Sequence, residues 1–249
     1  MELSFELTLV LAALMFVGAI LYTSVGHGGA SAYLAFMGLF GVPAEVMRPT
    51  GLILNIIVSS FTSFRYFRVG FFEWRVLWPF LLGAIPIAFI GGAIQLPGHF
   101  YKPLVAIVLF VAAIKLLWPN AMSATREVRP PPVVAGILIG AVIGLLSGLT
   151  GTGGGIFLSP ILMFMGWCEP RRASGVASVF ILCNSLSSLA GNASSVSALP
   201  SELPIFAVAV LSGAVIGTFL GIRKLPVQGI LKALGVVLII AGFKLLGLY

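Results

Sequence analysis

The sequence predicts an all-α polytopic membrane protein built from two repeats of inverted topology. Hydrophobic residues make up 59% of the 249 residues, charged residues only 8%, and the mean hydropathy is +1.15. Such values are typical of helical membrane proteins and not of globular ones. The apolar stretches are continuous, whereas a transmembrane barrel needs alternating segments of about ten residues. Two glycine-rich interruptions in corresponding positions of the two halves complete the prediction.

Five apolar segments in each half are expected to form helices. In the first half they cover about residues 7–25, 30–41, 46–64, 76–96 and 103–118. In the second half they cover about residues 133–149, 154–166, 174–192, 203–222 and 229–247. Glu2 and Glu6 precede the first segment and no basic residue does, so this segment is expected to be a retained helix and not a cleaved signal peptide.

The two halves match each other at a constant offset of 125 residues. The offset superposes residues of the same type, namely Gly26 on Gly151, Gly28 on Gly153, Gly29 on Gly154, Ser60 on Ser185, Ser63 on Ser188 and Pro79 on Pro204. Near the end of each half the offset becomes 129, which pairs Lys115 with Lys244. A register that holds across glycine, proline, serine and lysine indicates an internal duplication.

The predicted domains follow from this duplication. The first transmembrane repeat covers residues 1–118 and the second covers residues 133–249. Residues 119–132 between them form a polar linker that ends in three consecutive prolines, which cannot continue a helix.

The lysine and arginine residues predict which side of the membrane each loop occupies. Ten of the fourteen fall in residues 65–75, 119–132, 167–172 and 223–232, which are assigned to the cytoplasm. Lys115, at the end of its helix, joins them, and Arg48, Lys102 and Lys244 remain outside. Both termini are then extracytoplasmic and the repeats are inverted. Because the basic residues occur singly or in pairs between apolar spans, the formal charge of +7 indicates membrane topology and attraction of anions, not a nucleic-acid partner.

The segments 30–41 and 154–166 are too short to cross a membrane alone. At about 1.5 Å per residue they extend roughly 18–20 Å, less than a hydrocarbon core of roughly 30 Å. They are either re-entrant arms of deep hairpins or parts of broken helices that neighbouring residues complete. In both cases each half crosses the membrane an odd number of times, so the inverted relationship is unaffected.

The two interruptions are candidate substrate-binding sites, and their residues are Gly26, His27, Gly28 and Gly29 in the first break and Gly151, Thr152, Gly153, Gly154 and Gly155 in the second. Irregular backbone at membrane depth survives only where it is buried in protein or lines a polar cavity. A helix that begins just after Gly29 or Gly155 directs free N–H groups and the positive end of its dipole at the break, where an anion can bind. The alternative is that the glycines only permit sharp turns and tight packing.

Polar side chains in the third segment of each half form the second group of substrate-binding candidates. They are Asn55, Ser59, Ser60 and Ser63 in the first half and Asn184, Ser185 and Ser188 in the second. Hydroxyl and amide donors suit an oxyanion, although such residues also serve as hydrogen-bonding contacts between helices. His27 is the only ionisable side chain within either break, and it is either a proton-coupling group or a neutral structural histidine.

Two signatures, VGHGGASAYLAFMGLFGVP and TGTGGGIFLSPILMFMGW, each followed by a serine-bearing helix, resemble the TauE/SafE sulfite-exporter family of membrane permeases. The resemblance covers nearly the whole chain and implies transport of sulfur-containing anions such as sulfite, sulfoacetate or thiosulfate. The first signature departs from the second, with Ala30 where the second has Gly155 and Ala35 where it has Pro160. The site is therefore expected to be asymmetric.

The predicted function is a secondary transporter, an exporter, of small sulfur-containing oxyanions such as sulfite, thiosulfate or organosulfonates. It is expected to work by alternating access in the plasma (inner) membrane of a bacterium, with the lipid bilayer and a coupling proton or ion as partners. The alternatives are an anion channel and an intramembrane enzyme or sensor.

No catalytic residue, cofactor or metal site is expected. Cys168 and Cys183 have no metal-binding spacing, and the sequence has no HExxH motif. The glycine-rich run that ends at Gly155 is not followed by the Lys-Ser/Thr pair of a nucleotide-binding loop.

Overall fold

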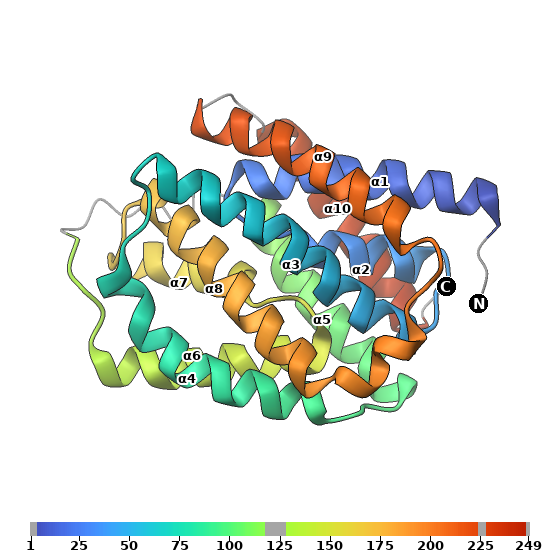
Figure 1. Ribbon diagram of the computed structural model, residues 1–249, viewed down its shortest axis with the longest axis horizontal. Helices are drawn as coiled ribbons and strands as arrows, with labels where there is room; N and C mark the ends of the chain where they lie inside the picture. Colours follow the sequence, from blue (N-terminus) through green and yellow to red (C-terminus); the bar gives the residue numbers. More distant parts are fainter. Residues whose placement is uncertain (1–3, 118–127, 224–227, 248–249) are drawn as a thin grey trace.

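The computed structural model describes residues 4–117, 128–223 and 228–247, and these residues are helical apart from short connections (Figure 1). The helices of the first half are α1 (Phe5–Ser24), α2 (Ala30–Leu39), α3 (Ala44–Arg68), α4 (Trp74–Ala93) and α5 (Gly98–Leu117). Those of the second half are α6 (Val133–Thr150), α7 (Gly155–Phe164), α8 (Pro170–Gly191), α9 (Leu203–Ile222) and α10 (Gln228–Leu245), with the 3₁₀ helix η2 (Ala193–Ala198) between α8 and α9.

The architecture confirms the prediction of an all-α polytopic membrane protein. Within the described ranges there is no strand, and six helices are long and apolar enough to cross a membrane: α1, α4, α5, α6, α8 and α9. Every predicted segment corresponds to one helix, with ends that differ by a few residues, whereas η2 was not predicted. Most of the predicted linker lies outside the described residues, and the division into two repeats remains a prediction.

The two short helices, α2 and α7, have 10 residues each and begin directly after the glycine breaks. The side chain of His27, just before α2, contacts Lys115 in the last turn of α5, and Leu39 at the end of α2 accepts a hydrogen bond from Lys244 in the last turn of α10. The chain therefore reverses direction after α1, so that α2 is the second arm of a hairpin (Figure 1).

The helices pack in pairs that join the two halves. Helix α4 lies along α6 and α1 lies along α9, while α3 packs on α8 and α5 on α10. When α1–α5 are matched in order with α6–α10, the pair α4–α6 corresponds to the pair α9–α1. The pairs α3–α8 and α5–α10 each correspond to themselves. The inverted relationship of the repeats stays a prediction that this pairing favours.

The basic connections lie at one end of the molecule. In Figure 1 the C-terminal ends of α3, α5, α7 and α9 and the N-terminal ends of α4, α6, α8 and α10 are on the left. The start of α1, the end of α10 and residues 192–202 are on the right. We call these the basic end and the outer end. The helix ends and connections at the basic end carry the arginines Arg65, Arg68, Arg75, Arg129, Arg171, Arg172 and Arg223. Their assignment to the cytoplasm remains a prediction from the charge distribution.

Glycines let the paired helices approach closely. A Cβ atom on Gly140 of α6 would lie 2.2 Å from the carbonyl oxygen of Phe80 in α4. A Cβ atom on Gly217 of α9 would lie 2.1 Å from Thr23 Oγ1 and 2.2 Å from the carbonyl oxygen of Ile20 in α1. No side chain fits at these distances, so these glycines fix the separation of the helix axes.

We expect Gly217→Ala to destabilise the protein, because the added methyl group must push α9 away from α1. Overpacking of this kind costs about 1–3 kcal/mol, and the midpoint of thermal unfolding in detergent should fall by roughly 2–10 °C. Gly98→Ala is the matched control, since a Cβ atom there meets nothing within 4 Å. Equal midpoints for the two variants would contradict the packing role of Gly217.

Candidate functional site

Both breaks are built from glycines in the left-handed region of backbone space. Gly29 and Gly154 are the residues immediately before α2 and α7, with φ angles of 95° and 78°. Gly151 ends α6 with a φ angle of 83° and Gly153 has 76°. Side chains other than glycine are disfavoured in this region, so the sequence of the breaks is dictated by their backbone. Helix α2 begins where the sequence predicts, at Ala30, and α7 begins at Gly155, within one residue of the predicted start.

The two breaks contact each other through His27. The Nε2 atom of His27 lies 3.1 Å from the carbonyl oxygen of Gly155 and 3.2 Å from Ser159 Oγ, both in α7. Its Nδ1 atom lies 2.9 Å from the carbonyl oxygen of Val25. His27 is 4% exposed. Residues separated by more than a hundred positions thus meet at one buried point between the two halves.

Asn55 of α3 forms a second link between the breaks. Its Oδ1 atom accepts a hydrogen bond of 3.2 Å from the backbone N–H of Ala30, so Asn55 caps the start of α2. Its Nδ2 atom donates to the carbonyl oxygen of Thr152 at 3.2 Å and lies 3.5 Å from Ser185 Oγ. Because Asn55 is fully buried, one amide fixes the position of both breaks.

Asn184 of α8 holds the second break from the other side. Its Nδ2 atom donates to the carbonyl oxygen of Gly153 at 3.3 Å. Its Oδ1 atom is buried and has no hydrogen-bond partner within the described part of the chain. A free buried acceptor of this kind costs stability, so its presence beside the break indicates a position that a ligand or water can complete.

The remaining predicted site residues are four serines of α3 and α8, three of them buried and one exposed. Ser59 and Ser188 are buried and donate to the backbone carbonyl oxygens of Asn55 and Asn184 within their own helices, so these hydroxyl groups do not contact the breaks. Ser63 is buried, and its hydroxyl has no hydrogen-bond partner among the described residues. Ser60 is exposed and donates to Ile56 within its own helix, so the structure does not bring it to the breaks.

Gly26 and Gly28 are in close contact with neighbouring helices. A Cβ atom on Gly26 would lie 2.5 Å from Ser174 at the start of α8, and one on Gly28 would lie 2.3 Å from Asn55 Oδ1. The tight-packing role that the sequence left open therefore applies at these two positions, alongside any role in binding.

Lys115 is a site residue that the sequence analysis missed. It was assigned to the basic cytoplasmic group, but its Nζ atom lies 2.8 Å from Nε2 of His27, inside the protein. Its repeat counterpart Lys244 is exposed and donates to the carbonyl oxygen of Leu39. The available signal was a lysine within an apolar segment. Assigning each basic residue to the nearest loop conceals the role of Lys115, because its long side chain extends back along the helix and away from the loop.

The contact between Lys115 and His27 can hold only a limited number of protons. With Nδ1–H donated to Val25, Nε2 is an acceptor for the Lys115 ammonium group; this tautomer is assigned from the partners. If both side chains were protonated, two cations would face each other at 2.8 Å. The pair therefore carries at most one positive charge in this arrangement, and a second proton would open it.

Arg48, which the charge distribution assigns to the extracytoplasmic side, is only 4% exposed. It donates to four backbone carbonyl oxygens at the C-terminal ends of α4 and α6. These are Ile94 at 2.8 Å, Gly91 and Gly92 at 2.7 Å and Gly148 at 2.5 Å. The cation thus satisfies carbonyl groups that have no partner in their own helices.

The cysteines do not contribute chemistry to these breaks. Cys168 and Cys183 are free thiols, and the described residues contain no group of three or more His, Cys, Asp or Glu side chains that could hold a metal ion. Burial raises the pKa of the Cys168 thiol, in the connection between α7 and α8, to about 12. This thiol therefore stays protonated at neutral pH.

Comparison with known proteins places this architecture among membrane transporters. Residues 10–245 match the family model "Sulfite exporter TauE/SafE". The chain is 37% identical over 243 residues to "Probable membrane transporter protein y4hK" of Sinorhizobium fredii, covering 95% of this chain and 97% of the relative. It is 31% identical over 181 residues to "Probable membrane transporter protein MJ0441" of Methanocaldococcus jannaschii, covering 65% and 64%.

A further relative is "Probable membrane transporter protein MamO" of Paramagnetospirillum magneticum. It is 24% identical over 246 residues, which cover 81% of this chain but only 38% of that longer protein. The likeness to y4hK therefore carries more weight, since it extends over almost the full length of both chains.

We expect Asn55→Leu to lower the stability of the purified protein by about 2–4 kcal/mol, because the N–H of Ala30 and the carbonyl of Thr152 lose their partner in a dry interior. Thermal unfolding in detergent measures the loss. Ser60→Ala is the control, since this serine was predicted to share the site but is exposed. The assignment of Asn55 as the link between the breaks is wrong if both variants unfold at the temperature of the parent protein.

Proposed function

The chain belongs to the sulfite exporter TauE/SafE family, and from this membership we propose that it is a secondary transporter of small sulfur-containing oxyanions such as sulfite, thiosulfate or organosulfonates. Family and relatives support a multi-pass membrane transporter and not an enzyme. The class of substrate, the site and the mechanism are the parts that we propose.

The observation that carries the proposal is the half-buried lysine at the contact between the two breaks. Lys115 reaches His27 next to Gly155, and no ion pair with a carboxylate is formed by Lys115 in the described ranges. A cation that is partly withdrawn from water and has no counter-ion is unfavourable. An anion bound at the breaks would supply the missing negative charge, and a cation or neutral solute would not.

The groups around Lys115 suit the oxygen atoms of a sulfite, thiosulfate or sulfonate group. Helix α7 directs the positive end of its dipole at the break, because it begins at Gly155. Ser159, Thr152 and Ser185 add hydroxyl groups that can donate hydrogen bonds. Several hydrogen-bond donors therefore lie close to the two breaks, as the binding of a compact oxyanion requires.

The arrangement also favours alternating access over a fixed pore. The hairpin of α1 and α2 and the hairpin of α6 and α7 belong to different halves, and they meet through the side chains of His27 and Asn55. A movement of one hairpin, together with the helix packed along its first arm, against the other hairpin would change this contact without disrupting either hairpin. Binding at the meeting point would then be open to one end of the molecule at a time.

The lysine–histidine contact provides a route for proton coupling. One positive charge on the pair balances one negative charge of the substrate. A dianion such as sulfite or thiosulfate would draw a second proton onto His27, which separates Lys115 from Nε2 and so changes the contact between the breaks. We propose that this proton moves together with the anion.

We expect purified protein in liposomes to show saturable uptake of sulfite, thiosulfate or a short organosulfonate, faster with a proton gradient than without one. Counterflow of labelled substrate against an excess on the opposite side should also occur, because a carrier exchanges its substrate. Conductance without counterflow would favour an anion channel. If none of the three anions moves, the proposed substrate class is wrong.

We expect Lys115→Met to reduce this uptake by at least about tenfold, since an interaction with a charged group is worth about 1.5–3 kcal/mol. Lys244→Met is the matched control, because Lys244 occupies the corresponding place in the other repeat but is exposed, and its uptake should stay within about twofold of the parent protein. Amounts of inserted protein must be equal. Normal uptake by Lys115→Met protein would show that the central cation does not bind the substrate.

A further inference from the structure

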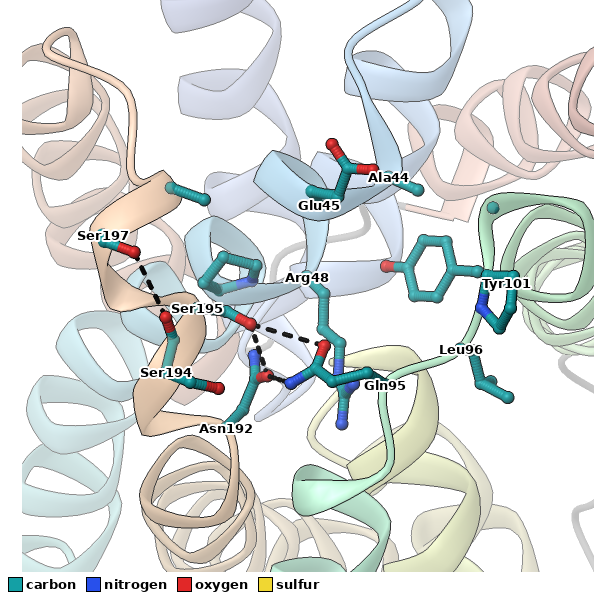
Figure 2. A pocket seen from close by; sticks show the side chains of 14 residues that line it. Ala44, Glu45, Arg48, Gln95, Leu96, Tyr101, Asn192, Ser194, Ser195 and Ser197 are labelled. Atoms are coloured by element: carbon teal, nitrogen blue, oxygen red, sulfur yellow. Dashed lines mark hydrogen bonds between the residues drawn. The ribbon is translucent and has the colours of Figure 1, made fainter.

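A buried cation, Arg48, lies beneath a cavity at the outer end of the molecule (Figure 2). The cavity has a volume of about 380 Å³ and is lined by residues from α3, α5, η2 and the chain that follows α4. We call it the outer cavity, and the polar side chains used in the argument are Glu45, Arg48, Gln95, Tyr101, Asn192 and Ser195. Its volume is that of a site for a small molecule.

Arg48 gives the floor of the outer cavity a positive charge that is not neutralised by an acidic residue in the described part of the chain. Both terminal nitrogens of its guanidinium group donate to backbone carbonyls, but its Nε atom is buried and has no partner. Glu45, one turn earlier on α3, is exposed and forms no ion pair with Arg48. Buried charges are normally paired, so this cation lacks a counter-ion.

Asn192 adds a second free donor. Its Oδ1 atom accepts hydrogen bonds from Gln95 Nε2 at 2.9 Å and from Ser195 Oγ at 2.8 Å (Figure 2). Its Nδ2 atom is fully buried and has no partner among the described residues. The unpaired groups of Arg48 and Asn192 are both donors, which selects for a ligand that accepts hydrogen bonds and carries negative charge.

The outer cavity adjoins the second break. Tyr101, which lines it, donates a hydrogen bond of 2.9 Å to the carbonyl oxygen of Thr150, the last residue of α6. A Cβ atom on Gly151 would lie 3.0 Å from the carbonyl oxygen of Arg48. A molecule in the cavity is therefore separated from the break by one layer of residues.

We propose that the outer cavity is a binding site for a small oxyanion, held by Arg48 and Asn192, and that the transported anion occupies it on the way between the outer end and the central breaks. This inference rests on the proposed function for the identity of the anion. Because the two free nitrogens are buried, the anion reaches them when the hydrogen bond between Gln95 and Asn192 opens. That hydrogen bond joins the two halves and has to break before the anion reaches the floor of the outer cavity.

The test measures the number of labelled thiosulfate or sulfite ions bound by the purified protein. The parent protein should bind two, Lys115→Met only the outer one and Asn192→Asp only the central one. Asn192→Asp keeps the acceptor for Gln95 and Ser195 but replaces the free donor by an anionic oxygen, so outer binding should weaken by at least about tenfold.

Glu45→Gln removes the negative charge at the rim and should strengthen outer binding. Lys102→Gln changes the net charge by the same amount as Asn192→Asp but does not line the cavity, and should leave binding within about twofold.

The outcomes separate this inference from the proposed function. A single bound anion that Lys115→Met abolishes and Asn192→Asp preserves would overturn the outer site and leave the central one intact. A single bound anion that Asn192→Asp abolishes and Lys115→Met preserves would support the outer site and contradict the central one. Opposite effects of Asn192→Asp and Glu45→Gln on affinity, with little effect of Lys102→Gln, would show that the cavity itself binds the anion. Equal effects of Asn192→Asp and Lys102→Gln would show that the general surface charge, and not the cavity, determines binding, and this result would overturn the site.

Discussion

The structure depends on satisfying two stretches of irregular backbone where water is absent. In hydrocarbon a regular helix bonds its own peptide groups, but a break leaves several of them free. Here Asn55 bonds the N–H of Ala30 in one half and the carbonyl of Thr152 in the other. The same requirement places Asn184 at Gly153 and Arg48 at the ends of α4 and α6. The breaks can exist only because distant helices complete them.

Completing the breaks in this way leaves positive charge unbalanced inside the protein. Lys115 and Arg48 are held by a neutral base and by carbonyl groups, and neither forms an ion pair with a carboxylate in the described residues. A permanent acidic partner would block an anion from these places. The same cations that hold the fold together are therefore the groups that can attract an oxyanion at the centre and at the outer end.

Much of the fold and part of the site could be predicted from local sequence. Continuous apolar segments gave the helices, and the glycines gave the breaks and the starts of α2 and α7 within a residue, because a left-handed backbone requires glycine. Asn55 was predicted among the polar residues of α3, and it does contact both breaks. Ser60 is likewise a polar residue within the apolar segment of α3, yet it is exposed. Polarity inside an apolar segment does not tell which face of the helix meets the other half.

Composition, hydropathy and the positions of glycine thus determined by themselves that this is a helical membrane protein with two breaks, since those features act over a few neighbouring residues. Tertiary structure alone decided which residues meet at the breaks. Lys115 lies far from His27 in sequence, and its long side chain bends from the end of α5 to the first break instead of joining the basic loops. Arg48 is drawn inward by carbonyl groups of α4 and α6. Such contacts arise from the packing of helices that are distant in sequence, which no local pattern in the sequence encodes.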